Sequence, residues 1–263
     1  MFIDSHVHFD LCLENKDLSE ENLIDELQKN DICYAVHVSI DNNGLSWAYE
    51  FSKRHKGVFY SIGIHPSSKA GVDDLHQVSA FINRIMSSGD SMDLFGIGET
   101  GLDFYRMNQP RDIQIRSFEY QVGLAKKWDL PLIVHSRDAF DETIRVLREK
   151  SPNSGIMHCF SGDRAMATRI LDLGLYISFA GNLTYKNAHN LHDAASFIPL
   201  DMILLETDAP FLTPVPFRGK RNRPKYVKHT YEYLAILRNE SLLRVEDSLY
   251  QNFTNLLKNR GGK

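Results

Sequence analysis

Eight short apolar segments recur along this chain, and most of the stretches between them carry a helical pattern. The segments, each interpreted as a strand, cover residues 1–8, 32–39, 58–64, 94–99, 132–135, 155–158, 175–178 and 202–208. Between the first two, Leu23, Ile24 and Leu27 share one helical face. Strands that alternate with helices pair in parallel, and eight such units close into a barrel. The pattern therefore predicts an α/β fold, a single (β/α)8 TIM barrel.

The length of the chain agrees with one such barrel. It has 263 residues, and a (β/α)8 barrel typically takes about 250 as one domain. No long linker, repeat or low-complexity stretch divides it, so residues 1–263 are predicted to form a single domain. The alternative is an open, doubly wound sheet. Its usual dinucleotide signature GxGxxG is absent, because Gly96 and Gly98 make only a GxG.

The composition excludes several classes of protein. With 43% hydrophobic and 24% charged residues the chain has the make-up of a globular protein with a sizeable core. No apolar run approaches the ~20 residues of a membrane span, and no basic and apolar leader precedes the first strand. Cys12, Cys33 and Cys159 form no CxxC pair, which argues against a disulfide framework. We expect a cytoplasmic protein without membrane association, and no obligate protein partner is indicated.

Ionisable residues stand at the ends of several predicted strands. The first strand ends in "DSHVHF", where His6 and His8 are one residue apart and so point to the same face. Four more such residues close later strands: Glu99, His135, His158 and Asp208. A single residue of this kind is more often structural, for example as a cap of the following turn. Six of them are expected to meet at one rim, because a barrel places the carboxyl ends of all its strands together.

Four imidazoles and two carboxylates favour a metal centre. Such a set suits borderline divalent ions, and Zn²⁺, Mn²⁺, Fe²⁺, Co²⁺ and Ni²⁺ are not distinguished; Mg²⁺ is less natural beside so many nitrogens. Six protein ligands are too many for one tetrahedral ion with an open position. The sequence therefore predicts two divalent metal ions about 3.5–4 Å apart. Glu99 is the candidate bridge, because it has two oxygens and falls between the two groups of ligands.

Seven motifs, in order, resemble those of a known family. They are "DSHVHFD", "GIHP", "GIGETGLDF", "PLIVHSRDA", "HCFSG", "ETDAPFLTP" and "RGKRNRP". Together they resemble the TatD family of metal-dependent deoxyribonucleases, a TIM-barrel branch of the amidohydrolase superfamily. The resemblance implies a divalent-metal nuclease, often a 3′–5′ exonuclease. It also implies the metal ligands His6, His8, Glu99, His135, His158 and Asp208. Where many relatives in the superfamily carry a modified lysine on strand four, this chain has Glu99, which fits the nuclease branch.

The predicted reaction is hydrolysis of a phosphodiester bond by a water activated by the metals. Asp208 and Glu99 are the predicted catalytic residues, with Asp208 placed to orient or deprotonate the water. Glu206 lies two residues earlier and is predicted to hydrogen-bond a ligand histidine. A buried polar residue satisfied elsewhere is an equally simple interpretation of Glu206.

Other residues are candidates for substrate binding. Arg137 can hold a phosphate through two N–H groups, although a plain salt bridge would also explain it. His65 closes the third strand and is predicted to bind phosphate or a water on a metal, and Asp103 to orient a loop or a base. The six basic residues of 218–228 have no Asp or Glu among them, and without them the net charge of −4 would be −10. They include Arg218, Lys220 and Arg221, the predicted phosphate-binding residues of this segment.

One residue departs from the family pattern, and two other functions stay open. Arg223 stands in "NRP" where the family commonly has an acidic residue, which puts the DNA substrate in question more than the hydrolase activity. The nearest alternative is the same chemistry on another ester, such as D-aminoacyl-tRNA. An alternative of another class is a non-catalytic barrel that binds nucleic acid. DNA is the predicted substrate ahead of RNA.

Overall fold

The computed structural model describes residues 1–14, 18–69 and 71–258. Eight strands form one sheet in the order of the sequence, from β1 to β8. Their bounds are β1 Phe2–Val7, β2 Ile32–Val38, β3 Val58–Ile62, β4 Leu94–Asp103, β5 Leu132–Arg137, β6 Gly155–Met157, β7 Tyr176–Phe179 and β8 Ile203–Leu205. Every predicted strand is present, with ends that differ by a few residues.

Helices occupy the segments between the strands and the end of the chain. They are α1 Phe9–Leu13, α2 Glu20–Lys29, α3 Leu45–Arg54, α4 Val72–Ser88, α5 Arg111–Trp128, α6 Phe140–Lys150, α7 Arg164–Leu171, α8 His189–Phe197, α9 Val227–Arg238 and α10 Leu242–Lys258. Four short 3-10 helices accompany them among the residues that the structure describes: η1 Ser91–Asp93, η2 Gly181–Thr184, η3 Leu200–Met202 and η4 Pro224–Tyr226. Among the described residues, no helix is both long and apolar enough to cross a membrane.

The sheet is that of a (β/α)8 barrel. β3, β4, β5 and β6 pair in parallel with one another in order, as β7 does with β8. A parallel bridge between Val7 and Ala209 joins the end of β1 to the segment after β8. A sheet whose first strand is bridged to the segment after its last is closed, whereas a doubly wound sheet has two free edges. The predicted TIM barrel is confirmed, and the open-sheet alternative is wrong.

Two strands end at places that the sequence did not predict. β4 continues four residues beyond Glu99, to Asp103, so Glu99 lies inside the strand. β8 ends at Leu205, so Asp208 lies beyond it. Asp208 has a φ of 53°, which is outside strand geometry, and the Thr207 amide donates to the Asp4 side chain rather than to a backbone carbonyl.

By its internal contacts the chain divides into two compact units that alternate along the sequence. The first comprises Met1–Val36, Cys159–Asp172 and Tyr176–Asn255. The second comprises His37–His158 with the short segments Leu173–Leu175 and 256–258. A single domain over residues 1–263 stays a prediction.

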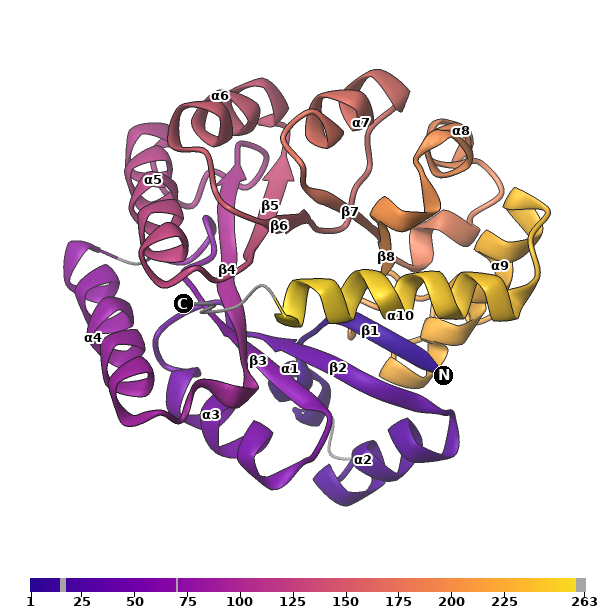
Figure 1. The fold of residues 1–263 in the computed structure, drawn as a ribbon, viewed down its shortest axis with the longest axis horizontal. Helices are drawn as coiled ribbons and strands as arrows, with labels where there is room; N and C mark the ends of the chain where they lie inside the picture. The colour runs from indigo at the N-terminus through magenta and orange to yellow at the C-terminus, as the bar shows by residue number, and fades with distance from the viewer. Residues whose placement is uncertain (15–17, 70, 259–263) are drawn as a thin grey trace. The chain divides into compact units, whose positions relative to one another are not determined.

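In the first unit, α9 and α10 pack on the amino-terminal parts of the strands (Figure 1). The Tyr231 ring of α9 meets Phe2 edge-on at 5.1 Å, and its hydroxyl lies 3.2 Å from the Ile3 carbonyl. The Asn252 amide of α10 donates to the carbonyls of Leu200 and Ile203 at the start of β8. These contacts stabilise the end of the strands that in barrel enzymes is remote from the chemistry.

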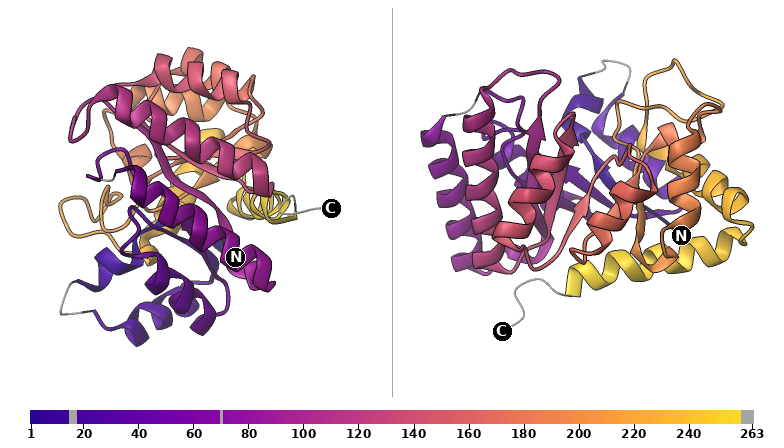
Figure 2. Two further views of the ribbon diagram at one scale, coloured as in Figure 1. Left: turned by 90° about the vertical axis from the view of Figure 1, so that its left-hand side faces the viewer. Right: turned by 90° about the horizontal axis from the view of Figure 1, so that it is seen from above.

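In the second unit, α4, α5 and α6 lie side by side outside β4 and β5 (Figures 1 and 2). Two buried glutamines of α5 reach the sheet. The Gln121 amide accepts from the Ile64 N–H at 2.8 Å and donates to the Ile64 carbonyl at 3.1 Å. Gln114 does the same with the backbone of Asp103, at 2.8 and 3.1 Å. The helix therefore fixes the backbone on which His65 and Asp103 stand.

Candidate metal centre

In the first unit, three of the predicted ligands face one another. The Nε2 atoms of His6 and His8 are 3.3 Å apart, and Asp208 Oδ1 lies 3.7 Å from His6 Nε2 and 3.5 Å from His8 Nε2. Both histidines are buried. Two imidazole nitrogens and a carboxylate oxygen that point at one another are a chelating group. We call His6, His8 and Asp208 the first ligand group.

The backbone holds this group in register. The Asp208 amide donates to the His6 carbonyl at 3.0 Å, and the His8 amide donates to the Ala209 carbonyl at 2.9 Å. The ladder between β1 and the segment after β8 thus continues past the end of β8. It brings together residues that are about 200 positions apart in the sequence.

Asp4 and Thr207 support the first ligand group and were not predicted from the sequence. Asp4 is fully buried, and both the amide and the hydroxyl of Thr207 donate to its carboxyl oxygens, at 2.8 and 2.5 Å. Burial raises the pKa of Asp4 to about 8, against the hydrogen bonds from Thr207. The available signal was the alternation of Asp4, His6 and His8 on one face of the strand.

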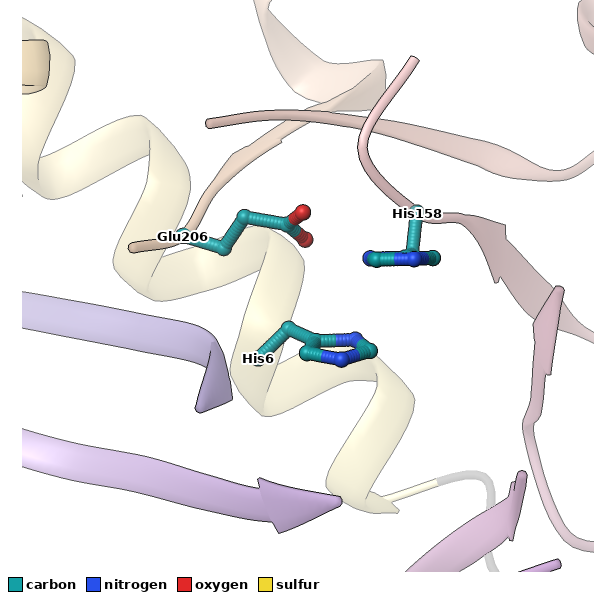
Figure 3. A group of neighbouring side chains, drawn as sticks. All are labelled: His6, His158 and Glu206. Atoms are coloured by element: carbon teal, nitrogen blue, oxygen red, sulfur yellow. The ribbon is translucent and has the colours of Figure 1, made fainter. Parts of the chain in front are cut away.

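Glu206 is buried just after the end of β8, and one of its oxygens accepts a hydrogen bond of 2.9 Å from the Cys159 amide. Figure 3 shows the carboxylate of Glu206 and the ring of His6 projecting in the same direction. The predicted hydrogen bond from a ligand histidine to Glu206 stays a prediction.

In the second unit, three imidazoles converge on one oxygen of Glu99. Glu99 Oε1 lies 2.9 Å from His135 Nδ1, 3.0 Å from His158 Nε2 and 3.3 Å from His65 Nε2. Burial by itself would raise the pKa of Glu99, but the histidines around it hold that pKa well below its usual range. Glu99 is thus an anion kept in the interior by imidazoles. We call Glu99, His135 and His158 the second ligand group.

Gly101 explains how His135 reaches its position. Glu99, Gly101 and Asp103 alternate along β4, and Gly101 pairs with His135 of β5 in the sheet register. A Cβ on Gly101 would lie 2.0 Å from the His135 carbonyl oxygen, and the φ of Gly101 is +133°. Because Gly101 has no side chain, β5 comes close, and His135 extends from Glu99 on one side to Asp103 Oδ2, 3.4 Å away, on the other.

Asp103 has two roles in the structure. Its Oδ1 accepts from the amides of Tyr105 and Arg106, at 3.0 and 2.8 Å, which fixes the turn after β4. Burial would raise its pKa, but the hydrogen bond with His135 and those two amides lower it to about 2. Asp103 was predicted to orient a loop or a base, and its contact with the loop after β4 is present within this unit.

His65 stands among these residues, although it was predicted to bind substrate. Its Nδ1 accepts a hydrogen bond of 3.0 Å from the Ser67 amide, so in the neutral ring the proton lies on Nε2, which faces Glu99. Nitrogen or oxygen atoms of His65, Glu99 and His135 lie within 4.8 Å of one another. His65 therefore supports Glu99 directly, and its role toward substrate stays a prediction.

Arg137 lies flat on an aromatic ring. Its guanidinium carbon is 3.9 Å from the centroid of Tyr105, a side chain that is itself 63% exposed. Stacking of this kind leaves the N–H groups at the rim of the guanidinium available to an anion. Arg137 was predicted from the sequence, whereas Tyr105 was not, because its position depends on the turn that Asp103 holds.

Hydrogen bonds from Asn222 hold the basic segment 218–228 beside Asp208. The Asn222 side-chain amide donates to the carbonyls of Thr207 and Phe211, at 2.9 and 2.5 Å. Among the predicted phosphate-binding residues, Arg218 stacks on Tyr185 at 4.2 Å, and Lys220 lies 5.6 Å from the ring centroid of Phe217. Arg221 donates to the Leu11 carbonyl.

Arg223, the residue that departs from the family pattern, forms an ion pair. Its guanidinium lies 2.7 Å from Glu26 of α2, and Lys225 lies 2.9 Å from the same carboxylate oxygen. Two of the positive charges of the segment are therefore partly neutralised within the protein. The side chain at position 223 serves to attach this segment to α2.

Both ligand groups fit divalent cations by their chemistry. Each combines imidazole nitrogens with a buried or half-buried carboxylate, the donors that Zn²⁺ and similar ions prefer. The histidines lie within 3.7 Å of the carboxylate oxygen of their group, and a neutral imidazole can offer its lone pair to a metal. Buried charged groups are paired or coordinate metal ions, so a cation is a suitable partner for each ligand group.

The sequence as a whole matches a known family. The TatD related DNase family matches residues 3–258. The chain belongs to the TatD family. This TatD protein is 34% identical, over 97% of its length and 94% of the relative's, to the Escherichia coli protein named uncharacterized metal-dependent hydrolase YcfH. It is 34% identical to YabD of Bacillus subtilis, which has the same description, over 98% of this chain and 99% of that one.

Solved structures agree. The crystal structure of YjjV, a TatD homolog from Escherichia coli, superimposes with a TM-score of 0.89 at 28% identity, over 97% of both chains. A TatD family hydrolase from Entamoeba histolytica has the same fold, with a TM-score of 0.84 at 21% identity and 97% of both chains covered. The predicted family is confirmed, and this TatD protein is a metal-dependent hydrolase of that family.

Proposed function

We propose that this TatD protein hydrolyses phosphodiester bonds of DNA, releasing nucleotides from the 3′ end with the help of two divalent cations. The observation that carries the proposal is the convergence of His135, His158 and His65 on one oxygen of buried Glu99, at 2.9 to 3.3 Å. Imidazole nitrogens gathered around a carboxylate oxygen are the donors that Zn²⁺ and similar ions prefer. The family match supports a nuclease among metal-dependent hydrolases.

Each ligand group is proposed to hold one cation. His6, His8 and Asp208 would form one site, and Glu99, His135 and His158 would form the other. When bound, the ions supply Lewis acidity toward the phosphate and lower the pKa of water. Their identity is not restricted beyond Zn²⁺, Mn²⁺, Mg²⁺, Fe²⁺, Co²⁺ and Ni²⁺.

Asp208 is proposed to orient the attacking water and take its proton. Its side chain is 13% exposed, whereas that of His6 is fully buried. The carboxylate is therefore the part of the first ligand group that solvent reaches. A carboxylate within reach of both imidazoles and of solvent can accept a proton and pass it on. Glu99, being enclosed, holds its position and its charge instead.

The protein's other residues are proposed to bind the substrate backbone. Arg137, held flat on Tyr105, offers N–H groups to a phosphate. Arg218, Lys220 and Arg221 provide positive charge beyond Asp208, where an extended strand of DNA is attracted. A cytoplasmic location is part of the same proposal.

Hydrolysis of end-labelled single- and double-stranded DNA, tested with each of the six metals after chelation, examines the proposal. We expect the wild-type protein to release nucleotides from the 3′ end of the labelled DNA when a metal is present. We expect Asp208→Asn to release none. RNA and a D-aminoacyl ester serve as parallel substrates. Hydrolysis of the aminoacyl ester but of neither nucleic acid would show that the protein is an esterase and not a nuclease. Binding of DNA without turnover under any metal would favour the non-catalytic barrel.

A further inference from the structure

Phe211 is an exposed aromatic residue three positions after Asp208. Its side chain is 48% exposed, whereas Ala209, two residues earlier, is fully buried. Several other large aromatic residues of this unit, such as Phe9, Phe179 and Tyr231, lie in the core. An exposed phenyl ring next to a candidate ligand group exposes apolar area to water unless something packs on it.

The turn that carries Phe211 is fixed. The Phe211 amide donates to the Asp208 carbonyl at 2.8 Å, and Asn222 Nδ2 donates to the Phe211 carbonyl at 2.5 Å. The backbone amide of Asn222 also donates to the Pro210 carbonyl at 3.1 Å. The backbone on both sides of the ring is thus pinned, and its exposure is a property of the fold rather than of a loose loop.

The surroundings of the ring match one kind of ligand. Its centroid lies 6.2 Å from that of His8, with the planes at 71°, so the ring adjoins the first ligand group. Asn222, which pins the turn, belongs to the basic segment, which also contains Arg218 and Lys220. This unit thus contains the flat apolar face of Phe211, the cationic side chains of the basic segment and the first ligand group. Together they suit a phosphate ester that carries a flat aromatic group.

We propose that Phe211 stacks against the nucleobase of the nucleotide whose phosphate is cleaved. This inference rests on the proposed function and deepens it. The ring contributes to substrate binding and makes the protein prefer esters that carry a base next to the scissile bond. Stacking tolerates every base, so Phe211 selects for the presence of a base and not for its identity.

Three variants test the inference. Phe211→Ala removes the stacking face, Phe211→Tyr keeps it, and Phe197→Ala removes a 40% exposed ring at the end of α8, which leads to the start of β8. Each is assayed on oligothymidylate and on the same strand with an abasic 3′-terminal residue. Each is also titrated with 2-aminopurine deoxyriboside 5′-monophosphate, whose fluorescence falls on stacking and which contains no phosphodiester bond.

We expect Phe211→Ala to raise KM on oligothymidylate by about tenfold or more. On the abasic strand it should leave KM unchanged, and it should abolish the quenching of 2-aminopurine. Phe211→Tyr and Phe197→Ala should behave as wild type. Equal KM values on oligothymidylate for wild type and Phe211→Ala, with quenching retained, would overturn the stacking role while leaving the nuclease proposal intact. Quenching that is present in wild type and absent in Phe211→Ala, without hydrolysis of any strand, would support stacking and overturn the nuclease.

Discussion

The hydroxyl of Thr207 donates a hydrogen bond of 2.5 Å to Asp4, and the Thr207 amide donates a second, of 2.8 Å, to the other oxygen of the same carboxyl group. Asp4 stands two residues before His6, and Thr207 stands directly before Asp208. One buried side chain of β1 therefore fixes the backbone that presents Asp208, while the strand that carries it presents His6 and His8. Asp4 is a positioning residue of the first ligand group.

Replacing Thr207 by Val should weaken both the fold and the ligand group. The change keeps the shape of the side chain but removes its hydroxyl group, and two hydrogen bonds are lost with it. One is the bond that the hydroxyl donates to Asp4, and the other is the bond of 3.2 Å that it accepts from the Ala209 amide. We expect a decrease of about 1–3 kcal/mol in the free energy of unfolding. We also expect the affinity for Zn²⁺ to fall about 10-fold or more. Urea denaturation in chelator and calorimetric titration of the metal measure the two effects separately.

Thr254→Val is the matched control. The Thr254 hydroxyl donates to the Gln251 carbonyl on an exposed part of α10, so its removal should change neither quantity by much. Wild-type metal affinity in Thr207→Val would show that Asp4 and Thr207 stabilise the fold without positioning the ligands.

The contact between His135 and Asp103 predicts how the stability of the metal-free protein depends on pH. Burial tends to lower the pKa of His135, but hydrogen bonds with Asp103 and Glu99 raise it above 6.5. The pKa of Asp103 is lowered from 3.8 to about 2. A lowered carboxyl pKa stabilises the fold above pH 3.8, and this contribution disappears as the pH falls towards 2. A raised imidazole pKa stabilises it below pH 6.5, and this contribution disappears as the pH rises through the folded value.

The contribution of this contact to the free energy of unfolding in chelator should therefore be greatest between about pH 4 and 6.5. Asp103→Asn should flatten the acidic limb, and should lower the stability at pH 5 by about 2 kcal/mol. Denaturant titrations from about pH 3 to 8 measure this profile. Asp112→Asn, which removes an exposed ion pair with Arg116, is the control. An unchanged profile in Asp103→Asn would rule out this contact as the source.

The sequence predicted those parts of the molecule that follow from local periodicity. Alternating apolar segments predicted all eight strands, because a buried parallel strand must be apolar on both faces. Ionisable residues at strand ends predicted the two ligand groups, because parallel strands present their carboxyl ends together. What the sequence did not predict depends on contacts between distant residues. The close approach of β5 to Gly101 and the hydrogen bonds of Thr207 with Asp4 join residues far apart in the sequence, and no local pattern encodes them.

The pairing of Arg223 with Glu26 is another such case. The two residues are almost 200 positions apart, and their charges meet only because η4 lies against α2. From the sequence alone Arg223 was a departure from the family pattern. In the fold it is a positive charge with a negative partner, which the sequence around position 223 does not contain.

Gly101 should tolerate no side chain. An added Cβ would lie 2.0 Å from the His135 carbonyl oxygen, at a φ of +133° that other residues avoid. We expect Gly101→Ala to lower the free energy of unfolding by about 3 kcal/mol or more, or not to fold. Gly123→Ala in the interior of α5 has nothing within 4 Å of the new methyl group and should gain up to about 1 kcal/mol. Equal stability of the two variants by thermal denaturation would contradict the close approach of β4 and β5.

The basic segment should govern the salt dependence of DNA binding. Arg218 and Lys220 lie on aromatic rings, whereas Lys225 shares Glu26 with Arg223. Replacing Arg218 and Lys220 together by Ala should reduce the slope of log KM against log salt concentration by roughly 0.7 for each phosphate that the variant no longer binds. Lys225→Ala should leave the slope nearly unchanged. A wild-type KM that does not respond to salt would remove the segment from substrate binding.

The metal content of variants should show one ion for each ligand group. We expect wild type, reloaded with Zn²⁺ after chelation, to bind two ions per chain. His6→Ala/His8→Ala should bind one, because the first ligand group keeps only Asp208. Glu99→Gln should weaken binding at the other site, because it removes the charged ligand oxygen. Asp208→Asn should abolish hydrolysis and leave the circular dichroism spectrum unchanged. Two ions retained in His6→Ala/His8→Ala would place the second cation elsewhere, and full turnover in Asp208→Asn would exclude Asp208 as the group that accepts the proton of water.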